Sequence, residues 1–315
     1  TDRGQLYWLK VYKIPEGSRT AKGKAVVNLI NLQADEKIKA IIPTSDFDES
    51  KSLCFFTKNG LIKRTNLSEY QNIRSVGVRA INLDENDELV TAIVVQRDEN
   101  ERILSDDEPK NLENNDANGE KYGKMLFVVT KKGMCIKFNL AGVREIGRVS
   151  RGVTAIKFKE KNDEVVGAVF IENDMQEILS ISAKGIGKRT NAGEYRLQSR
   201  GGKGVICMKL TDKTKELISV VIVDEAMDLM ALTSSGKMIR VDMQSIRKAG
   251  RNTSGVIVVN VENDEVVSIA KCPKEEDLNE EDENICTTKK KSKDLNFNFE
   301  NKQKLNSKSN KNNDK

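Results

Sequence analysis

A glycine-rich stretch with a basic residue on either side is the most distinctive local motif in the chain. Residues 198–204 read Gln-Ser-Arg-Gly-Gly-Lys-Gly. The three glycines leave backbone N–H groups free to approach a phosphate, and Arg200 and Lys203 supply positive charge. The stretch lacks the Gly-Lys-Ser/Thr ending of a nucleotide-binding P-loop, and no helix is predicted after it. The motif therefore indicates a loop that contacts phosphates, and a flexible turn that enters a strand is the alternative.

Few other residues are suited to catalysis or metal binding. The 315 residues include no histidine, which excludes His-based triads, His-ligated metals and imidazole acid–base catalysis. None of the five cysteines forms a Cys-x-x-Cys pair, which argues against a zinc site. An odd, scattered set of cysteines is typical of reduced thiols in the cytosol. We therefore expect no catalytic residue, no metal site and no cofactor in this chain.

The charge of the chain is unevenly distributed. Its formal net charge is +5, but residues 98–120 contain nine acidic and two basic residues, and residues 273–315 are neutral overall. The remaining residues, 1–97 and 121–272, therefore have a net charge of +12. A region this basic is a candidate for binding a polyanion, and ordinary solubilising charge is the alternative.

Five repeated units run through the chain, each with three landmarks in a fixed order. The first landmark is a glycine in a polar turn, and the second is a glycine before a β-branched run, 17 or 19 residues later. The third is a polar turn that carries an acidic residue in every unit and follows after 9 to 12 residues. The turn glycines are Gly4, Gly60, Gly133, Gly185 and Gly236, and the second glycines are Gly23, Gly77, Gly152, Gly204 and Gly255. This regularity predicts a repeat architecture.

Each unit reads as four short strands. In the second unit they are residues 53–57, 61–64, 78–83 and 89–95, with an Asn-Gly pair at the first turn that is typical of a hairpin. The corresponding strands are 126–130, 135–138, 153–158 and 165–171 in the third unit, 178–182, 187–190, 205–210 and 217–223 in the fourth, and 229–233, 238–241, 256–261 and 266–272 in the fifth. Units of about 50 residues with four strands predict an all-β, propeller-like fold, and a solenoid of sheets is the alternative.

The predicted domain covers residues 1–272, with an acidic loop at 98–120 and a disordered tail at 273–315. Five blades are visible, and we expect six in the intact protein. The first unit begins inside a hairpin, with its second strand at 6–11, so we expect its first strand to lie upstream. No apolar stretch is long enough for a membrane helix, and no signal peptide opens the chain.

Basic residues recur at the same places in successive units: on the second strand, on the connection to the third, and in the hairpin turn, which adds Arg3, Lys58, Lys131, Lys132 and Lys184. Closure of a ring would align them as a belt that can follow a curved duplex and neutralise its phosphates. The rival interpretation is a solvated rim on a protein-binding propeller. The connections also carry Arg144 and Arg196. The candidate DNA-contacting residues are Gln198, Arg200, Gly201, Gly202, Lys203, Gly204, Lys63, Arg64, Lys137, Arg148, Arg151, Lys188, Arg189, Arg240, Arg247 and Arg251.

Residues 6–16, 19–23 and 250–256 resemble the C-terminal domain of the A subunit of bacterial DNA gyrase, whose close relative is the A-type subunit of topoisomerase IV. The signature box of that family is Gln, a basic residue, Arg-Gly-Gly, a basic residue and Gly. Residues 198–204 match it except at Ser199. In the family the box usually lies in the first blade, whereas this copy lies in the fourth unit. Two interpretations stay open: a second, degenerate box here, or a principal box upstream of Thr1.

The resemblance implies a β-pinwheel, in which neighbouring blades exchange strands and the basic rim wraps duplex DNA. It implies that the intact type II topoisomerase uses ATP and Mg to introduce negative supercoils, with its cleaving tyrosine upstream of this chain. The implied partners are double-stranded DNA and, in an A2B2 enzyme, the B subunits with the rest of the A subunits, without a membrane. The implied location is the bacterial cytoplasm, at the nucleoid.

The alternatives are a protein-interaction propeller or the corresponding domain of topoisomerase IV. The acidic run 275–283 could compete with DNA for the rim.

Overall fold

The computed structural model describes residues 1–18, 23–72, 76–96 and 124–274. The predicted acidic loop at 98–120 lies outside these residues, as does the predicted tail from residue 275 onward. The described part of the chain is all-β with short 3-10 helices, and it has no helix long and apolar enough to cross a membrane. Its strands are β1 (Gln5–Leu6), β2 (Lys51–Thr57), β3 (Leu61–Asn66), β4 (Val78–Arg79), β5 (Leu89–Gln96), β6 (Met125–Thr130), β7 (Met134–Asn139), β8 (Val153–Thr154), β9 (Val165–Ile171), β10 (Glu177–Ser182), β11 (Ile186–Asn191), β12 (Val205–Ile206), β13 (Leu217–Ile222), β14 (Met227–Thr233), β15 (Met238–Asp242), β16 (Val256–Ile257) and β17 (Val266–Pro273).

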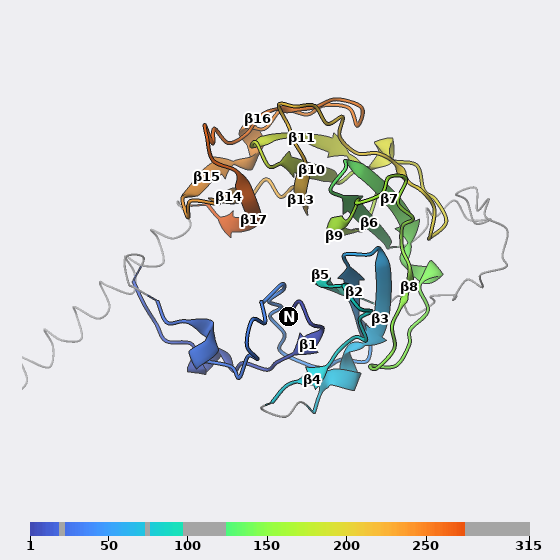
Figure 1. The fold of residues 1–315 in the computed structure, drawn as a ribbon, viewed down its shortest axis with the longest axis vertical. Coiled ribbons are helices and arrows are strands. Elements are labelled where there is room, and N and C mark those ends of the chain that lie inside the picture. The colour runs from blue at the N-terminus through green and yellow to red at the C-terminus, as the bar shows by residue number, and fades with distance from the viewer. Residues whose placement is uncertain (19–22, 73–75, 97–123, 275–315) are drawn as a thin grey trace, which may run out of the picture.

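The sheets follow one another around a ring (Figure 1). Unit 2 contributes β2 to β5, unit 3 contributes β6 to β9, unit 4 contributes β10 to β13, unit 5 contributes β14 to β17, and unit 1 contributes β1. Strands β5, β9, β13 and β17 lie nearest the ring centre, whereas β8 and β16 lie at its outer edge. The inner strands line a central cavity of about 630 Å³. The predicted propeller-like arrangement is confirmed, although unit 1 supplies only one strand to it.

Neighbouring units exchange their third strands. The sheet orders are β5-β2-β3-β8, β9-β6-β7-β12 and β13-β10-β11-β16, so the outer strand of each sheet comes from the following unit. β1 pairs with β4 in the same way. The exchanged pairs have a common register, such as Ile62 with Val153 and Cys135 with Val205. The strand exchange of a β-pinwheel is therefore present at four junctions.

The third strands are shorter than the sequence predicts. Only two residues after each second glycine pair with the preceding unit, so the predicted strands 78–83, 153–158, 205–210 and 256–261 end after their second residue. The next N–H turns to the hairpin glycine of the preceding unit, as in Ala155 N–H to the Gly60 carbonyl at 2.8 Å. The predicted strand at 6–11 likewise shrinks to β1 and is followed by the 3-10 helix η1 (Val11–Lys13).

Two glycines show why the landmarks are glycines. Gly60 has φ +86°, and a Cβ there would lie 2.7 Å from the Ile156 carbonyl oxygen of the next unit. Gly204 has φ +70°, and a Cβ there would lie 2.2 Å from the Cys135 carbonyl oxygen of the preceding unit. Both residues therefore need the left-handed conformation and the absence of a side chain, because another backbone passes against them. Strand exchange is the physical origin of the repeat.

Unit 5 differs from the units before it. Its sheet, β15-β14-β17, has three strands, since no exchanged strand pairs with β15 among the described residues. Consistently, a Cβ at Gly236 would meet no described atom within 4 Å. The ring of paired strands is therefore open between units 5 and 1 in the part of the chain that the structure describes.

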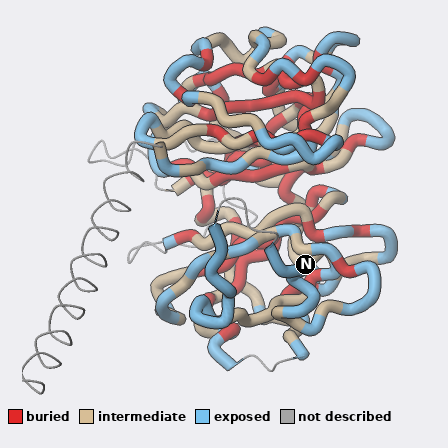
Figure 2. The backbone as a smooth tube through the Cα atoms, turned by 90° about the vertical axis from the view of Figure 1, so that its left-hand side faces the viewer, coloured by how far each residue is buried: buried red, intermediate tan, exposed pale blue. Residues whose placement is uncertain are grey.

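The hydrophobic core is divided among the junctions between sheets. One cluster joins units 2 and 3 through Phe56, Leu126 and Phe138, and a second joins units 3 and 4 through Phe127 and Tyr195. Two further clusters serve the other junctions. Figure 2 shows the buried residues along the strands and the exposed residues on the connections. Each unit is stabilised by its neighbours, which holds the connections in a fixed order around the ring.

Candidate nucleic-acid interface

Lys63 and Lys188 on the second strands are fully buried. The Lys63 Nζ donates hydrogen bonds to the carbonyls of Ala80 and Arg148. The Lys188 Nζ donates to the carbonyls of Gly250 and Arg251, at 2.7 Å each. Arg148, Gly250 and Arg251 belong to the connection of the following unit. These lysines therefore fasten one unit to the next.

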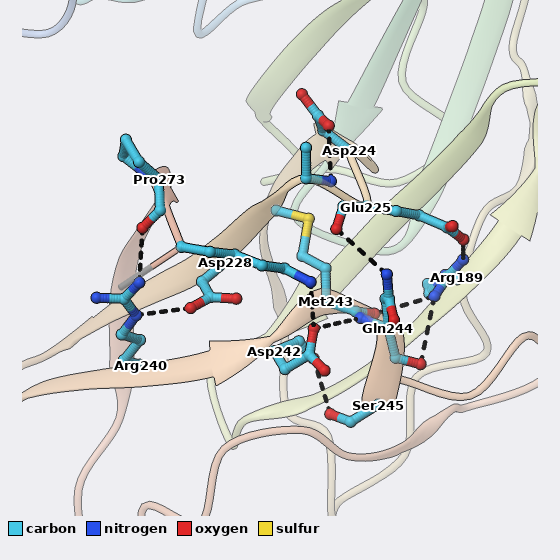
Figure 3. A network of polar contacts seen from close by, with 12 residues as sticks. Arg189, Asp224, Glu225, Asp228, Arg240, Asp242, Met243, Gln244, Ser245 and Pro273 are labelled. Atoms are coloured by element: carbon cyan, nitrogen blue, oxygen red, sulfur yellow. Dashed lines mark hydrogen bonds and ion pairs between the residues drawn. The ribbon is translucent and has the colours of Figure 1, made fainter. Parts of the chain in front are cut away.

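Arg64, Lys137 and Arg189 are also buried beside their neighbours' backbones. Lys137 donates to Asp174 at 2.7 Å and to the Ala192 carbonyl at 2.9 Å. Arg189 donates to the Met243 carbonyl at 3.0 Å and pairs with Glu225 (Figure 3). It also pairs with Glu177. The prediction that the second-strand basic residues line an exposed rim is therefore wrong for Lys63, Arg64, Lys137, Lys188 and Arg189. Their charges meet carbonyls and carboxylates inside the junctions, because a buried charge needs such partners.

Arg240 occupies the same strand position in unit 5 and is only partly buried. Its guanidinium donates to Asp228 and to the Pro273 carbonyl, at 2.6 Å each (Figure 3). Because no following unit covers β15 among the described residues, Arg240 closes its own sheet instead of a junction. It is therefore engaged within unit 5.

The glycine-rich stretch 198–204 lies across unit 3. Arg200 donates from Nε to the Gly142 carbonyl at 3.1 Å and from its terminal nitrogen to the Thr154 carbonyl at 2.8 Å. The Gly201 N–H donates to the Ala155 carbonyl at 2.8 Å, so it is not available to a phosphate. Lys203 is exposed. The stretch thus braces the junction between units 3 and 4 and leaves Lys203 as its outward charge.

The same bracing recurs in the neighbouring connections. Arg148 donates to the Glu69 carbonyl at 3.2 Å, and Arg251 donates to the Ile206 carbonyl at 3.3 Å. Arg148, Arg200 and Arg251 each lie 15 residues after their turn glycine. Arginine at this position therefore holds the connection onto the preceding unit while its half-buried side chain stays at the surface.

A second set of arginines projects into solvent from the same connections. Arg144, Arg196 and Arg247 each lie 11 residues after their turn glycine, just beyond a 3-10 helix, and all three are exposed. Among the described residues, no carboxylate lies within ion-pair distance of these arginines or of Lys203. We call Arg144, Arg196, Arg247 and Lys203 the rim set. The candidate residues above omit Arg144 and Arg196, and their shared spacing is the signal that identifies them.

Two other exposed basic residues on the connections, Arg151 and Lys248, are paired. Arg151 forms an ion pair with Asp84, and Lys248 forms one with Glu177. Exposed pairs of this kind contribute little to stability, about 0–1 kcal/mol. A polyanion can therefore compete for Arg151 and Lys248 at small cost.

At the opposite end of the units, lysines and carboxylates of neighbouring units form ion pairs. Lys131 lies between Glu164, at 3.0 Å, and Glu216 of the next unit, at 3.4 Å. Lys58 is likewise paired with Glu164 of the next unit, at 3.4 Å. The hairpin turns and the acidic turns thus lie at the same end, so the prediction that the turn lysines belong to the basic belt is wrong for Lys58 and Lys131. Exposed lysines such as Lys132 and Lys161 also lie at this end.

A known family model coincides with the five units. The model described as DNA gyrase C-terminal domain, beta-propeller, matches residues 1–45, 51–96, 124–172, 176–224 and 228–273. The chain belongs to this family. The matched segments of the gyrase C-terminal domain leave out residues 97–123, which include the acidic insertion seen in the sequence.

Relatives of this gyrase C-terminal domain are proteins about three times its length. The DNA gyrase A subunit of Campylobacter jejuni is 84% identical over 295 residues, which cover 90% of this chain and 34% of the relative. The DNA gyrase A subunit of Helicobacter pylori (strain ATCC 700392 / 26695) is 54% identical over 278 residues, covering 88% and 30%. The chain therefore spans about a third of the curated relatives that it matches.

Two solved structures share the fold. The C-terminal domain of DNA topoisomerase IV superposes with a TM-score of 0.69 at 21% identity, covering 86% of this chain and 77% of the other. The DNA gyrase A C-terminal domain superposes with a TM-score of 0.68 at 24% identity, covering 86% and 80%. At this identity the two structures support the fold alone.

The buried lysine at the junction of units 2 and 3 predicts a pH dependence of stability. Burial lowers the pKa of Lys63 from 10.5 to about 8. Between these values the unfolded gyrase domain binds more protons than the folded one, so the cost of burying the charge is relieved as pH rises. The free energy of unfolding of the wild type, minus that of Lys63→Met, should therefore increase from about pH 7.5 to about pH 9.5 in urea titrations. The same comparison with the exposed Lys161→Met should show no trend, and a flat or falling difference for Lys63→Met would contradict the buried charge.

Proposed function

We propose that this chain binds duplex DNA along its outer connections and bends the duplex around the ring. The observation that carries the proposal is the recurrence of an exposed arginine at the same position of three successive units, Arg144, Arg196 and Arg247. Evenly repeated cations on a curved surface neutralise successive phosphates and release counterions. Such contacts position a duplex without reading its bases.

The buried lysines and arginines support this function indirectly. They fix each connection onto the preceding unit through carbonyl contacts, for example Lys188 to Gly250 at 2.7 Å. A preorganised row of connections binds without the cost of ordering loops when DNA arrives. The rigid junctions therefore position the rim set, and the rim set contacts the phosphates.

The relatives support a proposal for the role of the whole enzyme. DNA gyrase A subunits match this chain over about a third of their length. We infer that the chain is the DNA-wrapping part of a bacterial type II topoisomerase in an A2B2 complex, located in the cytoplasm at the nucleoid. In that enzyme the cleaving tyrosine lies in the remainder of the A subunit. ATP and Mg serve the other parts of the enzyme. This chain therefore bends the DNA and contributes no catalytic group.

Duplex length tests the wrapping. Binding should be about tenfold or more tighter to a duplex of about 150 base pairs than to one of about 25, at equal nucleotide concentration, because only the longer duplex can follow several units. Electrophoretic mobility in low salt measures both complexes, and a sharply bent long duplex should migrate more slowly than its mass predicts. Equal affinity per nucleotide with unbent mobility would contradict wrapping and favour a protein-interaction propeller.

A further inference from the structure

Two buried thiols lie in one hydrophobic cluster inside the junction between units 3 and 4. Cys135 is in β7, Cys207 directly follows β12, and both are completely buried in one hydrophobic cluster. Cys135 pairs with Val205, and the Cys207 N–H donates to the Gly133 carbonyl at 2.8 Å, so both cysteines lie on the same short ladder. Both side chains belong to the same buried cluster, and each thiol group affects the pKa of the other. The pair therefore spans the boundary between a unit and the strand that it receives.

The surroundings make the two sulfurs unequal. The Tyr195 hydroxyl lies 3.8 Å from the Cys207 Sγ, and the Lys188 ammonium contributes positive charge nearby. The interaction with Cys135, together with that of Tyr195, lowers the pKa of Cys207 against the opposing effect of burial, whereas burial raises the pKa of Cys135. Since the thiolate is the reactive form, the Tyr195 hydroxyl beside the Cys207 sulfur favours Cys207 as the nucleophile, with Cys135 as the resolving residue.

Strand exchange itself does not require this pair. The positions equivalent to Cys135 and Cys207 hold other residues at the remaining junctions, and Cys54 lies in a different cluster. Those residues are Ile62 and Ala155 between units 2 and 3, Gly187 and Val258 between units 4 and 5, and Leu6 and Ala80 between units 1 and 2. A thiol pair is therefore a local feature of the junction that carries the glycine-rich stretch 198–204.

We propose that Cys135 and Cys207 are a reversible oxidation site, at which hydrogen peroxide forms a disulfide that locks β12 onto β7. The Cys207 thiolate attacks one peroxide oxygen, the O–O bond breaks, and a sulfenic acid and one water form after proton uptake. The Cys135 sulfur then displaces the hydroxyl group from the sulfenic sulfur, which releases the second water. Two thiols lose two electrons and two protons, and one peroxide becomes two waters. A dithiol reverses the reaction.

The short exchanged strand provides the route for peroxide. β12 has only two residues, which pair with Cys135 and Met134. Such a short ladder opens locally far more easily than the long strands of a sheet, and a separated β12 admits a molecule of the size of peroxide. Once formed, the disulfide prevents this opening. Residue 204, the last of the glycine-rich stretch, immediately precedes β12. The disulfide therefore also ties this stretch covalently to unit 3.

Mass spectrometry of the peroxide-treated chain tests the site. In peptide maps, the peptides that carry Cys135 and Cys207 should be joined with a loss of about 2 Da, and dithiothreitol should separate them and restore that mass. The thermal midpoint of the oxidised chain should rise by about 5 °C, since the bond closes a long loop. Cys54→Ala should behave as the wild type, whereas Cys207→Ala should lose the mass change.

The mapping of the wild-type chain decides the question even if a variant fails to fold. Free thiols at Cys135 and Cys207 after complete oxidation of Cys272, the half-buried cysteine, would overturn the proposal. A disulfide that joins either residue to Cys54 or Cys272 in place of its neighbour would overturn it as well.

Discussion

Gly204→Ala should destabilise the domain by about 3 kcal/mol or more, a loss at the upper end for single substitutions. Two costs combine at this position. Gly204 has φ +70°, which an alanine adopts at a cost of about 1–2 kcal/mol. Its new Cβ would also lie 2.2 Å from the Cys135 carbonyl oxygen, so β12 would have to leave β7. The exchanged strand and the glycine-rich stretch would lose their attachment to unit 3.

Gly201→Ala is the matched control, because it lies in the same stretch and has a similar φ of +78°. The nearest atom to its Cβ would be the Thr154 carbonyl oxygen at 3.7 Å, an ordinary contact. Its cost should therefore be the backbone strain alone, about 1–2 kcal/mol. Urea denaturation of both variants measures the difference. Equal losses would show that close packing of the exchanged strand against β7 does not determine the need for glycine at 204.

Removing the three rim arginines should weaken DNA binding about 100-fold at low salt. The triple variant Arg144→Gln, Arg196→Gln and Arg247→Gln removes three exposed charges that have no ion-pair partner among the described residues. If each contacts one phosphate, about 1 kcal/mol is lost per contact, and the slope of log K against log salt becomes shallower by about 3. Titration of a duplex of about 150 base pairs at several salt concentrations gives both quantities.

The control for the rim variant carries the same change of charge at the other end of the units. Lys132, Lys161 and Lys237 are exposed and lie at the hairpin-turn and acidic-turn end. Their replacement by Gln should change the salt slope by less than about 1. A comparable loss from both triple variants would mean that binding follows net charge and not the position of the connections.

Landmarks at fixed spacing made the architecture predictable. Glycine is needed where another backbone passes close by, and this need can be seen at single positions in the sequence. Gly60 lies against the chain that leaves β8, and Gly204 immediately precedes β12. The length of an exchanged strand cannot be seen in this way. Apolar residues continue past 154 and 206 because they enter the core and not because they extend a ladder, so the predicted third strands were too long.

The role of the second-strand lysines was not predictable from local sequence. A lysine beside an arginine at 63–64 or 188–189 is typical of an exposed basic strand. The groups that satisfy the buried Lys188 are the carbonyls of Gly250 and Arg251, 62 and 63 residues away. Every residue has a main-chain carbonyl, so the sequence does not show which carbonyls accept hydrogen bonds from a buried lysine. It shows the charged residue but not its hydrogen-bond partners. The exposed arginines, by contrast, need only their spacing to be recognised.

Protection of lysines in the DNA complex tests the central claim most directly. The account places DNA on the outer connections, where Lys203 is exposed, and away from the opposite end, where Lys132 and Lys161 are exposed. Acetylation of the chain with and without a duplex of about 150 base pairs, read by peptide mass spectrometry, compares these residues in one sample. We predict that DNA reduces the acetylation of Lys203 about fivefold or more and leaves Lys132 and Lys161 unchanged. Protection of Lys132 and Lys161 with Lys203 still reactive would contradict the account.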